Sequence, residues 1–274
     1  MVDGYAVLVG DFVYVGGGNC ASGDAVYKYS YKNNNWSTLP KANRQKFAMV
    51  CYKKQLVLIG GRGLNAEYYG SLLVWDEVLH MWTDSLYPPM NNARMMTAAC
   101  SHEERIIVAG GKSRRSSTLD SVEVFDGKEW LDAAQLPTKI YSAKTAVFKD
   151  DLFIMGGEGQ KKAVYCVSLE SLKGDTQKWE SIPDTEFPYA SIAAFGNTLL
   201  AIGGSTPMGS TSAVRAYFTG RKTWLRVDRP LPRTFCCTAV VVISPKELLL
   251  IGGCSGTIKC KHVFKGKLKY SSSS

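Results

Sequence analysis

The sequence predicts an all-β protein, a six-bladed β-propeller whose blades are four-stranded antiparallel sheets. Three signals that recur along the chain predict it: a Gly-Gly pair after a short apolar run, a tryptophan about twenty residues later, and a Leu-Pro that closes several of the repeats. A period of roughly 40 to 50 residues is typical of one propeller blade per repeat.

The Gly-Gly pair is the most regular of these signals. It follows an apolar run six times, as in VYVGG, VLIGG and LLIGG, and successive pairs begin 44, 50, 46, 47 and 49 residues apart. Glycine is favoured where backbones approach closely or where φ is positive. The predicted pairs are Gly16-Gly17, Gly60-Gly61, Gly110-Gly111, Gly156-Gly157, Gly203-Gly204 and Gly252-Gly253.

A tryptophan keeps step with the glycines. Five tryptophans lie 19 to 22 residues after the second glycine of their repeat, and in three repeats an aromatic residue (Tyr29, Trp75 or Tyr217) precedes the tryptophan by seven residues. We expect each such pair to face across a hairpin, and each tryptophan to fill the widening gap between neighbouring blades. The periodic tryptophans are Trp36, Trp82, Trp130, Trp179 and Trp224.

Within each repeat the chain indicates four short strands in order. An apolar run such as FAMVCY is followed by a polar turn, the run that ends in Gly-Gly, a variable loop, a third strand such as SVEVF, a turn such as DGKE, and the tryptophan strand. No segment shows sustained helical periodicity, and SLESLKGDTQ at 168–177 is interpreted as a long hairpin loop. The prediction is one domain, 1–270, with blades over about 3–40, 44–88, 94–137, 140–186, 189–230 and 233–270, and a disordered Ser tail at 271–274.

The sixth repeat departs from the pattern because it has no tryptophan. We expect the segment KHVF-KG-KLKY to form the closing hairpin, with its turn at Lys-Gly and with Leu268 or Tyr270 in place of the tryptophan. Blade six is therefore predicted to be the least stable.

Composition narrows the class of protein. The chain has 274 residues, 45% of them hydrophobic, and a net charge of +9. No stretch approaches the ~20 apolar residues of a membrane span, and the start MVDGYAVLVGD lacks the features of a signal peptide. A cytosolic or nuclear location is expected. The positive charge favours acidic partners or nucleic acid.

The eight cysteines form no C-x-x-C pair, and the three histidines are scattered. A zinc site would require paired Cys/His spacing. We therefore interpret the cysteines as small buried hydrophobes in a reducing compartment, and predict no structural metal and no cofactor.

The order apolar strand, Gly-Gly, aromatic, tryptophan, Leu-Pro resembles the kelch repeat, over essentially Tyr5 to Tyr270. The chain is similar to the kelch domain of BTB-kelch (kelch-like) proteins. WD-repeat propellers have a similar period, but the only Trp-Asp here is Trp75-Asp76, at the third-strand position.

The resemblance implies a binding face made by the loops after Gly-Gly and by the segments that lead into each blade. Arg44 and Arg94 lie 16 residues before their Gly-Gly, and arginines there commonly point to the channel mouth in kelch modules. Arg233 is given the equivalent place in blade six; Ile140 and Pro188 replace the arginine in blades four and five, each followed by a tyrosine. The alternative is that these arginines are solvated or bind loop carbonyls. The predicted peptide-binding residues are Arg44, Arg62, Arg94, Lys112, Arg114, Tyr141, Tyr189 and Arg233.

The resemblance implies a protein-interaction module, the substrate-recognition domain of a BTB-kelch-type cullin ubiquitin ligase adaptor. Its partner would be an acidic or phosphorylated peptide, and the ligase would be contacted through domains outside this chain. Alternatives are a cytoskeletal, actin-type scaffold and a propeller enzyme, for which Glu158, Cys254 and Tyr141 form no recognisable catalytic set. Nucleic-acid binding lacks interleaved aromatics within a basic stretch. We predict a non-enzymatic protein without a membrane partner.

Overall fold

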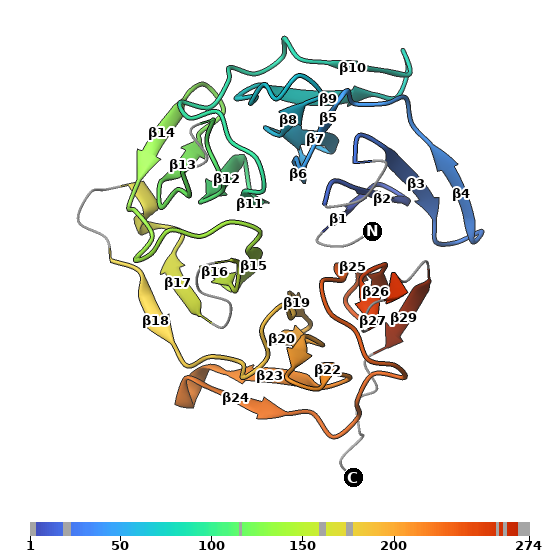
Figure 1. Ribbon diagram of the computed structural model, residues 1–274, viewed down its shortest axis with the longest axis vertical. Helices are drawn as coiled ribbons and strands as arrows, with labels where there is room; N and C mark the ends of the chain where they lie inside the picture. The colour runs from blue at the N-terminus through green and yellow to red at the C-terminus, as the bar shows by residue number, and fades with distance from the viewer. Residues whose placement is uncertain are drawn as a thin grey trace.

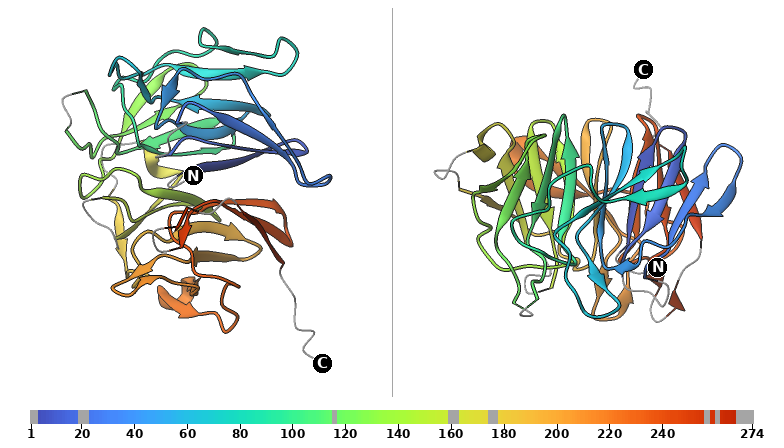
Figure 2. Two further views of the ribbon diagram at one scale, coloured as in Figure 1. Left: turned by 45° about the vertical axis from the view of Figure 1, so that its right-hand side comes forward. Right: turned by 90° about the horizontal axis from the view of Figure 1, so that it is seen from above.

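Six antiparallel sheets are arranged in a ring in the computed structural model of the chain (Figure 1), which describes residues 4–18, 23–114, 117–158, 163–173, 178–255, 258–259 and 262–267. The innermost strands of all six sheets line a central channel. The predicted fold class is confirmed. Seen from the side, the strands run between two opposite faces, and the loops gather at those faces (Figure 2).

Each blade is a meander from the channel outward. Blade one has β1 (Tyr5–Val9), β2 (Phe12–Gly16), β3 (Val26–Ser30) and β4 (Asn35–Thr38); blade two has β6 (Ala48–Tyr52), β7 (Gln55–Ile59), β9 (Leu72–Asp76) and β10 (Met81–Thr83); blade three has β11 (Ala98–His102), β12 (Arg105–Ala109), β13 (Val122–Phe125) and β14 (Trp130–Ala133). Blade four has β15 (Lys144–Phe148), β16 (Asp151–Met155), β17 (Val164–Ser168) and β18 (Glu180–Ile182); blade five has β19 (Ser191–Phe195), β20 (Thr198–Ile202), β23 (Val214–Phe218) and β24 (Thr223–Arg226); blade six has β25 (Ala239–Ser244), β26 (Glu247–Ile251) and β29 (Val263–Lys267).

Short strands and turns lie outside the blade sheets. They are the two-residue strands β5 (Arg44–Gln45), β8 (Arg62–Gly63), β21 (Ser205–Thr206), β22 (Gly209–Ser210), β27 (Cys254–Ser255) and β28 (Ile258–Lys259), and the 3-10 turns η1 (Ser171–Lys173) and η2 (Thr219–Arg221). The insertion at 168–177 thus contains η1, and its residues 174–177 lie outside the described part of the chain.

The ring closes by packing of the innermost strands. β1, β6, β11, β15, β19 and β25 contact one another in that order, and β25 contacts β1 (Figure 1). An apolar cluster joins the first and last blades, with Val13 and Val15 against Val241, Ile243 and Leu249. Burial of such side chains favours closure by about 25 cal/mol per Å² of apolar surface removed from water.

The predicted turn of the last hairpin, in blade six, is wrong. Lys265 and Gly266 were expected to form the turn of the last hairpin. Instead β29 continues through both residues and pairs with all five residues of β26, so that Lys265 lies opposite Leu249 and Gly266 opposite Leu248. The full length of β26 offers backbone partners, and the strand continues for as long as they last. Leu268 and Tyr270 lie outside the described residues.

The tryptophans connect neighbouring blades as expected. Tyr29, Trp75 and Tyr217 lie directly opposite their tryptophans across the outer hairpin. Indole N–H groups then donate to backbone carbonyls of the preceding blade: Trp82 to Pro40 (2.8 Å), Trp130 to Pro88 (2.9 Å), Trp179 to Ala134 (2.9 Å) and Trp224 to Pro183 (2.9 Å). Three of these four acceptors are prolines, and one of them, Pro40, belongs to a Leu-Pro pair.

The diglycines are where successive blades touch. A Cβ on Gly60 would lie 2.3 Å from the carbonyl oxygen of Arg94, which begins blade three, and both Gly60 and Gly61 have positive φ. The amide of Gly61 donates to that same carbonyl at 2.8 Å. In blade one the pair with two positive φ values is Gly17-Gly18, while Gly16 ends β2. The predicted pair Gly16-Gly17 is therefore one residue early, because the run of three glycines hides the register.

A polar cluster at Glu77 links blades one and two. Its carboxylate accepts hydrogen bonds from Tyr14 (3.3 Å) and Trp75 (2.6 Å) and forms an ion pair with Lys28. Burial raises the pKa of the Glu77 carboxyl. The hydrogen bond and charge of Lys28, together with the hydrogen bonds from Trp75 and Tyr14, lower it by more than burial raises it, so the pKa lies below its ordinary value.

Candidate functional site

Antiparallel pairing brings two kinds of segment to one end of the channel. The first strand of each blade begins at the end where the second strand stops, so the lead-in segment before the first strand and the residue after the diglycine are neighbours. We call this end the mouth face. Its residues after the diglycine are Arg62, Lys112, Glu158, Ser205 and Cys254.

Backbone pairs fix these residues to the lead-in segments. Gln45 pairs with Arg62, Met95 with Lys112, Tyr141 with Glu158 and Cys236 with Cys254, and Ser205 donates to the carbonyl of Pro188 at 2.8 Å. Each position after a diglycine is thus held by the frame of the fold, while its side chain is left to vary between a cation, an acid, a hydroxyl and a thiol.

Arg94 does not reach the mouth face. Its guanidinium is fully buried and donates to the carbonyls of Gly110 (2.9 Å) and Ser121 (3.1 Å). It also forms an ion pair with Glu123, which is fully buried as well. Burial lowers the pKa of the Arg94 guanidinium, and the Glu123 charge acts in the opposite direction. These contacts place Arg94 inside blade three, and no surface is left for a peptide.

Arg44 is buried in the same way in blade two. It donates to Ser71 through the backbone carbonyl (2.9 Å) and the hydroxyl (3.2 Å), and its guanidinium lies 4.3 Å from the ring centre of Tyr69. Leu73 occupies the position that Glu123 has in blade three, so this arginine has no carboxylate there. Burial lowers the pKa of Arg44 to about 10, against smaller effects of Tyr69 and Asp84. The placement of Arg44 and Arg94 corrects the expectation that they point to the channel mouth, and matches the alternative that they bind loop carbonyls.

The predicted equivalents in blades five and six also shift. Left-handed backbone recurs two residues after the arginine position, at Met96, Ser142, Tyr189 and Cys237 among others. Counting back from it gives Phe187 in blade five and Phe235 in blade six, in place of Pro188 and Arg233. A β-bulge between Val242 and Ser244 lengthens the last hairpin and obscures the count. Arg233 itself is exposed and lies two residues before Phe235, the position that recurs in the lead-in segments.

Tyr141 and Tyr189 lie in lead-in segments, at the mouth face. The ammonium of Lys112 lies 3.9 Å from the ring centre of Tyr141, and the hydroxyl of Tyr189 donates to Glu158 Oε1 at 3.1 Å. All four side chains are half-buried. They form an aromatic arc over blades three to five, defined by Lys112, Tyr141, Glu158 and Tyr189.

Blades two and three supply a basic arc, defined by Arg62, Lys112 and Arg114. Arg62 is half-buried, and its Nε is buried with no hydrogen-bond partner among the described residues. Arg114 is exposed and lines a cavity of about 400 Å³ together with the loop residues 65–69 of blade two, Glu67 among them. Within the described chain, none of the three cations has a carboxylate at ion-pair distance.

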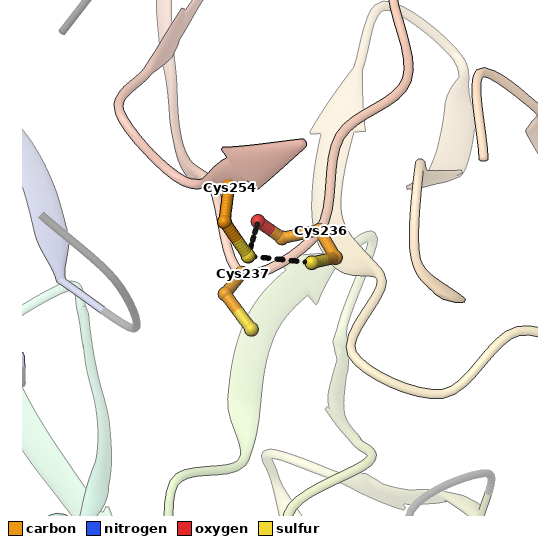
Figure 3. A group of neighbouring side chains, drawn as sticks. All are labelled: Cys236, Cys237 and Cys254. Atoms are coloured by element: carbon orange, nitrogen blue, oxygen red, sulfur yellow. Dashed lines mark hydrogen bonds between the residues drawn. The ribbon is translucent and has the colours of Figure 1, made fainter. Parts of the chain in front are cut away.

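Blade six presents thiols that the sequence analysis treated as separate. The sulfur atoms of Cys236, Cys237 and Cys254 all lie within 4.8 Å of one another (Figure 3). The spacing rule for paired cysteines missed them, because two are adjacent and the third comes after the diglycine. Placing Cys254 after its diglycine and Cys236 in the lead-in segment would have brought them together.

The three enzyme candidates named from the sequence do not form one set. Tyr141 and Glu158 are backbone partners in blade four, whereas Cys254 lies with the other cysteines in blade six. Over the described residues, no helix has the length and apolar character required to cross a bilayer.

Comparisons with known proteins agree with this architecture. The Kelch motif family matches residues 93–137, which is blade three with its lead-in segment. The chain is 22% identical to human Kelch-like protein 23 over 74% of its length, and 24% identical to Kelch-like protein 25 of Xenopus tropicalis over 89%. It covers only 36% and 43% of those two proteins.

A fungal relative and a solved structure extend the pattern. Kelch-like protein terF of Aspergillus terreus is 27% identical over 83% of this chain, which covers 56% of that protein. The structure of YjhT superposes with a TM-score of 0.77 at 15% identity, over 97% of this chain and 93% of YjhT. At that identity the structural likeness establishes the fold alone. The six-fold repeat and the ring of blades make the chain a six-bladed β-propeller, and these similarities support kelch-type repeats in it.

Proposed function

We propose that the mouth face binds an acidic or phosphorylated segment of a protein partner. The observation that carries the proposal is the basic arc. Its residues, Arg62, Lys112 and Arg114, lie on neighbouring loops and have no carboxylate partner among the described residues. Guanidinium groups suit bidentate binding of carboxylate or phosphate. The net charge of +9 adds long-range attraction for an acidic segment.

The aromatic arc supplies the second part of the proposed site. Tyrosine and arginine are enriched among the residues that dominate binding energy at interfaces. Tyr141 and Tyr189 are each fixed by a polar neighbour, Lys112 and Glu158, so little side-chain entropy is lost on binding. Glu158 would repel a carboxylate, so the acidic group of the partner is placed over blades two and three and its apolar part over blades four and five.

The wider role we propose is substrate recognition in a cullin-based ubiquitin ligase adaptor. Support comes from the similarity to Kelch-like proteins, whose lengths extend well beyond the aligned part. In this role the propeller is a binding module without catalytic chemistry, and it acts in the cytosol or nucleus. Co-purification of the full gene product with a cullin, and imaging of the tagged product, test these two points; failure of either removes that point alone.

The mouth-face proposal is tested with an array of peptides that carry glutamate runs or phosphoserine, each beside its neutral counterpart. The purified propeller is expected to retain acidic peptides. Reversal of Arg62, Lys112 and Arg114 to glutamate is expected to weaken retention at least tenfold, at ~1.4 kcal/mol per factor of ten.

A matched control separates location from total charge. Arg221, Arg226 and Arg229 are exposed in or next to the outer hairpin of blade five, and their reversal changes the net charge equally. This control variant is expected to retain acidic peptides nearly as well as the wild type. Equal loss in both variants would show a diffuse charge effect, and no loss in the first would refute the site. Co-sedimentation with actin filaments by the wild type would instead support the cytoskeletal alternative.

A further inference from the structure

Three cysteines converge at the mouth face in blade six. Cys236 and Cys237 belong to the lead-in segment before β25, and Cys254 begins β27 directly after Gly252-Gly253. Cys236 and Cys254 are backbone partners, with N–H to O distances of 3.0 and 2.9 Å in the two directions. The two segments are therefore held side by side by the fold, whatever their side chains.

Backbone geometry explains how two consecutive cysteines serve one cluster. In an extended strand, neighbouring side chains point to opposite faces. Cys237 has φ of +54°, which is left-handed and not extended, and its sulfur lies within 4.8 Å of the other two. Met96, Ser142 and Tyr189 have the same left-handed backbone, so the conformation belongs to the propeller and not to cysteine.

The fold does not require cysteine at any of the three positions. The equivalents of Cys237 in the other blades include Met96, Ser142 and Tyr189, and the equivalents of Cys254 are other residue types as well. The backbone geometry therefore does not explain why three cysteines lie together in blade six, since other side chains are found at the equivalent positions. The equivalents of Cys254 are Arg62, Lys112, Glu158 and Ser205, and those of Cys236 are Gln45, Met95, Tyr141 and Pro188.

The cluster has the chemistry of a thiophilic metal centre. Zinc is bound by thiolates at about 2.3 Å in tetrahedral geometry, which places two sulfurs on one ion roughly 3.8 Å apart. The three sulfurs lie within 4.8 Å of one another, and those of Cys236 and Cys254 are 2.7 Å apart. Small side-chain rotations, which open that pair by about 1 Å, would give an ion room between all three.

Neighbouring groups suit such a centre. The Ser210 hydroxyl lies 3.4 Å from the Cys236 sulfur, where it can donate to a thiolate, as outer-sphere partners of metal ligands do. The Cys254 thiol contacts the Cys236 carbonyl at 3.7 Å, and its proton leaves when a metal binds. Cys236 and Cys237 are buried and Cys254 is half-buried, so an ion would be reached from the side of Cys254.

We propose that Cys236, Cys237 and Cys254 bind one Zn²⁺ ion through their thiolates, which ties the lead-in segment of blade six to the loop after its diglycine. A disulfide between Cys236 and Cys254 would use two of the sulfurs and give Cys237 no role, and we therefore favour the metal. The inference does not depend on what the mouth face binds.

The test uses the reduced, purified protein and the metal alone. Equilibrium dialysis against Zn²⁺ is expected to give one ion per chain. Replacement by Co²⁺ should give the thiolate-to-cobalt charge-transfer absorption and the intense visible bands of tetrahedral coordination. Cys237→Ser and Cys254→Ser each remove a direct ligand and are expected to lower the affinity by at least the ~10–100-fold that loss of an outer-shell partner costs. Both should fold, because blade four has Ser142 and blade five has Ser205 at the equivalent positions.

Cys166→Ser is the matched control. Cys166 lies in β17, away from the cluster, and burial with the charges of Glu180 and Asp151 raises the pKa of its thiol to about 11, which makes it a poor metal ligand at neutral pH. This variant is expected to bind zinc like the wild type. Three outcomes would overturn the proposal: no bound zinc in the wild type, unchanged affinity in Cys254→Ser, or a cobalt spectrum without charge-transfer absorption. Re-formation of a Cys236–Cys254 disulfide after reduction, with zinc present and no metal retained, would overturn it in favour of a redox pair.

Discussion

Replacement of Glu123 by leucine tests what holds the buried arginine of blade three. The Glu123 carboxylate accepts hydrogen bonds from the backbone amides of Asn91 (2.7 Å) and Asn92 (3.1 Å), from the Asn92 side chain (3.0 Å) and from Arg94. Glu123→Leu removes every one of these acceptor contacts. It also leaves the Arg94 charge buried without its counter-ion.

The expected cost is about 3 to 5 kcal/mol in the free energy of unfolding, the range for removal of one partner from a buried ion pair. The lower part of that range is favoured because Arg44 remains buried with backbone carbonyls and no carboxylate at the equivalent place. The double variant Arg94→Ile, Glu123→Leu reproduces residues found elsewhere in the ring, Ile140 in blade four and Leu73 in blade two. It removes the orphaned charge but leaves the amides of the lead-in segment without an acceptor, so we expect it to cost about 1 to 3 kcal/mol.

Urea unfolding of the wild type, both single variants and the double variant gives the coupling free energy between the two positions. The expected coupling is about 2 kcal/mol, with the double variant more stable than Glu123→Leu alone. A cost below about 1 kcal/mol for Glu123→Leu would refute the reasoning from buried charge. So would a double variant whose loss equals the sum of the two single losses.

Three further predictions concern the frame. Gly60→Ala should lower the free energy of unfolding by more than ~3 kcal/mol, since its Cβ would lie 2.3 Å from a carbonyl oxygen. Gly10→Ala, at positive φ but with open space around it, should lower it by only ~1–2 kcal/mol. Similar losses in the two variants would contradict the argument from close approach. Trp130→Phe should cost ~1–3 kcal/mol and leave a carbonyl unpaired, while Trp36→Phe, with 41% of Trp36 exposed, should cost less than ~1 kcal/mol, both measured by denaturant unfolding. The pKa of Glu77 is lowered on folding, so this carboxylate stabilises the fold above the unfolded-state pKa near 4.5, and the stabilisation is lost as pH falls through the folded-state pKa. Glu77→Gln should therefore reduce the loss of stability at acid pH, by no more than ~1 kcal/mol because the carboxylate is half exposed. An unchanged loss of stability at acid pH would show that Glu77 does not contribute to it.

The ring of blades was predictable from the sequence because its signals are backbone requirements. A residue such as Gly60 has no room for a Cβ, and an indole such as that of Trp130 must reach a carbonyl of the blade before it. These constraints recur in each blade, so they leave a period in the sequence. The exact pair in blade one was misplaced because Gly16, Gly17 and Gly18 are consecutive, and only φ tells them apart.

The site was less predictable because a residue type does not fix the direction of its side chain. Arg44 and Arg94 have the spacing expected of channel-mouth arginines, yet both turn back to the carbonyls of their own blade. Their acceptors, Ser71 and Ser121, lie 27 residues further on, beyond a loop of unpredictable length. The location of Tyr141 on the mouth face follows from the repeat, because it is next to Ile140, whose carbonyl accepts the amide of the preceding blade's second glycine.

The arginine position shows how the propeller separates stability from recognition. At this point of successive blades the chain has Arg44, Arg94, Ile140, Phe187 and Phe235, and the backbone carbonyl of Arg94, Ile140 or Phe235 accepts the second-glycine amide of the preceding blade. Since the backbone makes the contact between blades, the side chain is free to be a cation or an apolar group, provided that it fills its own blade. The position after the diglycine is equally fixed in backbone, but its side chain lies at the mouth of the channel. Variation there changes the surface without disturbing the ring, which is why we locate partner binding at the basic arc and the metal at the cysteines of blade six.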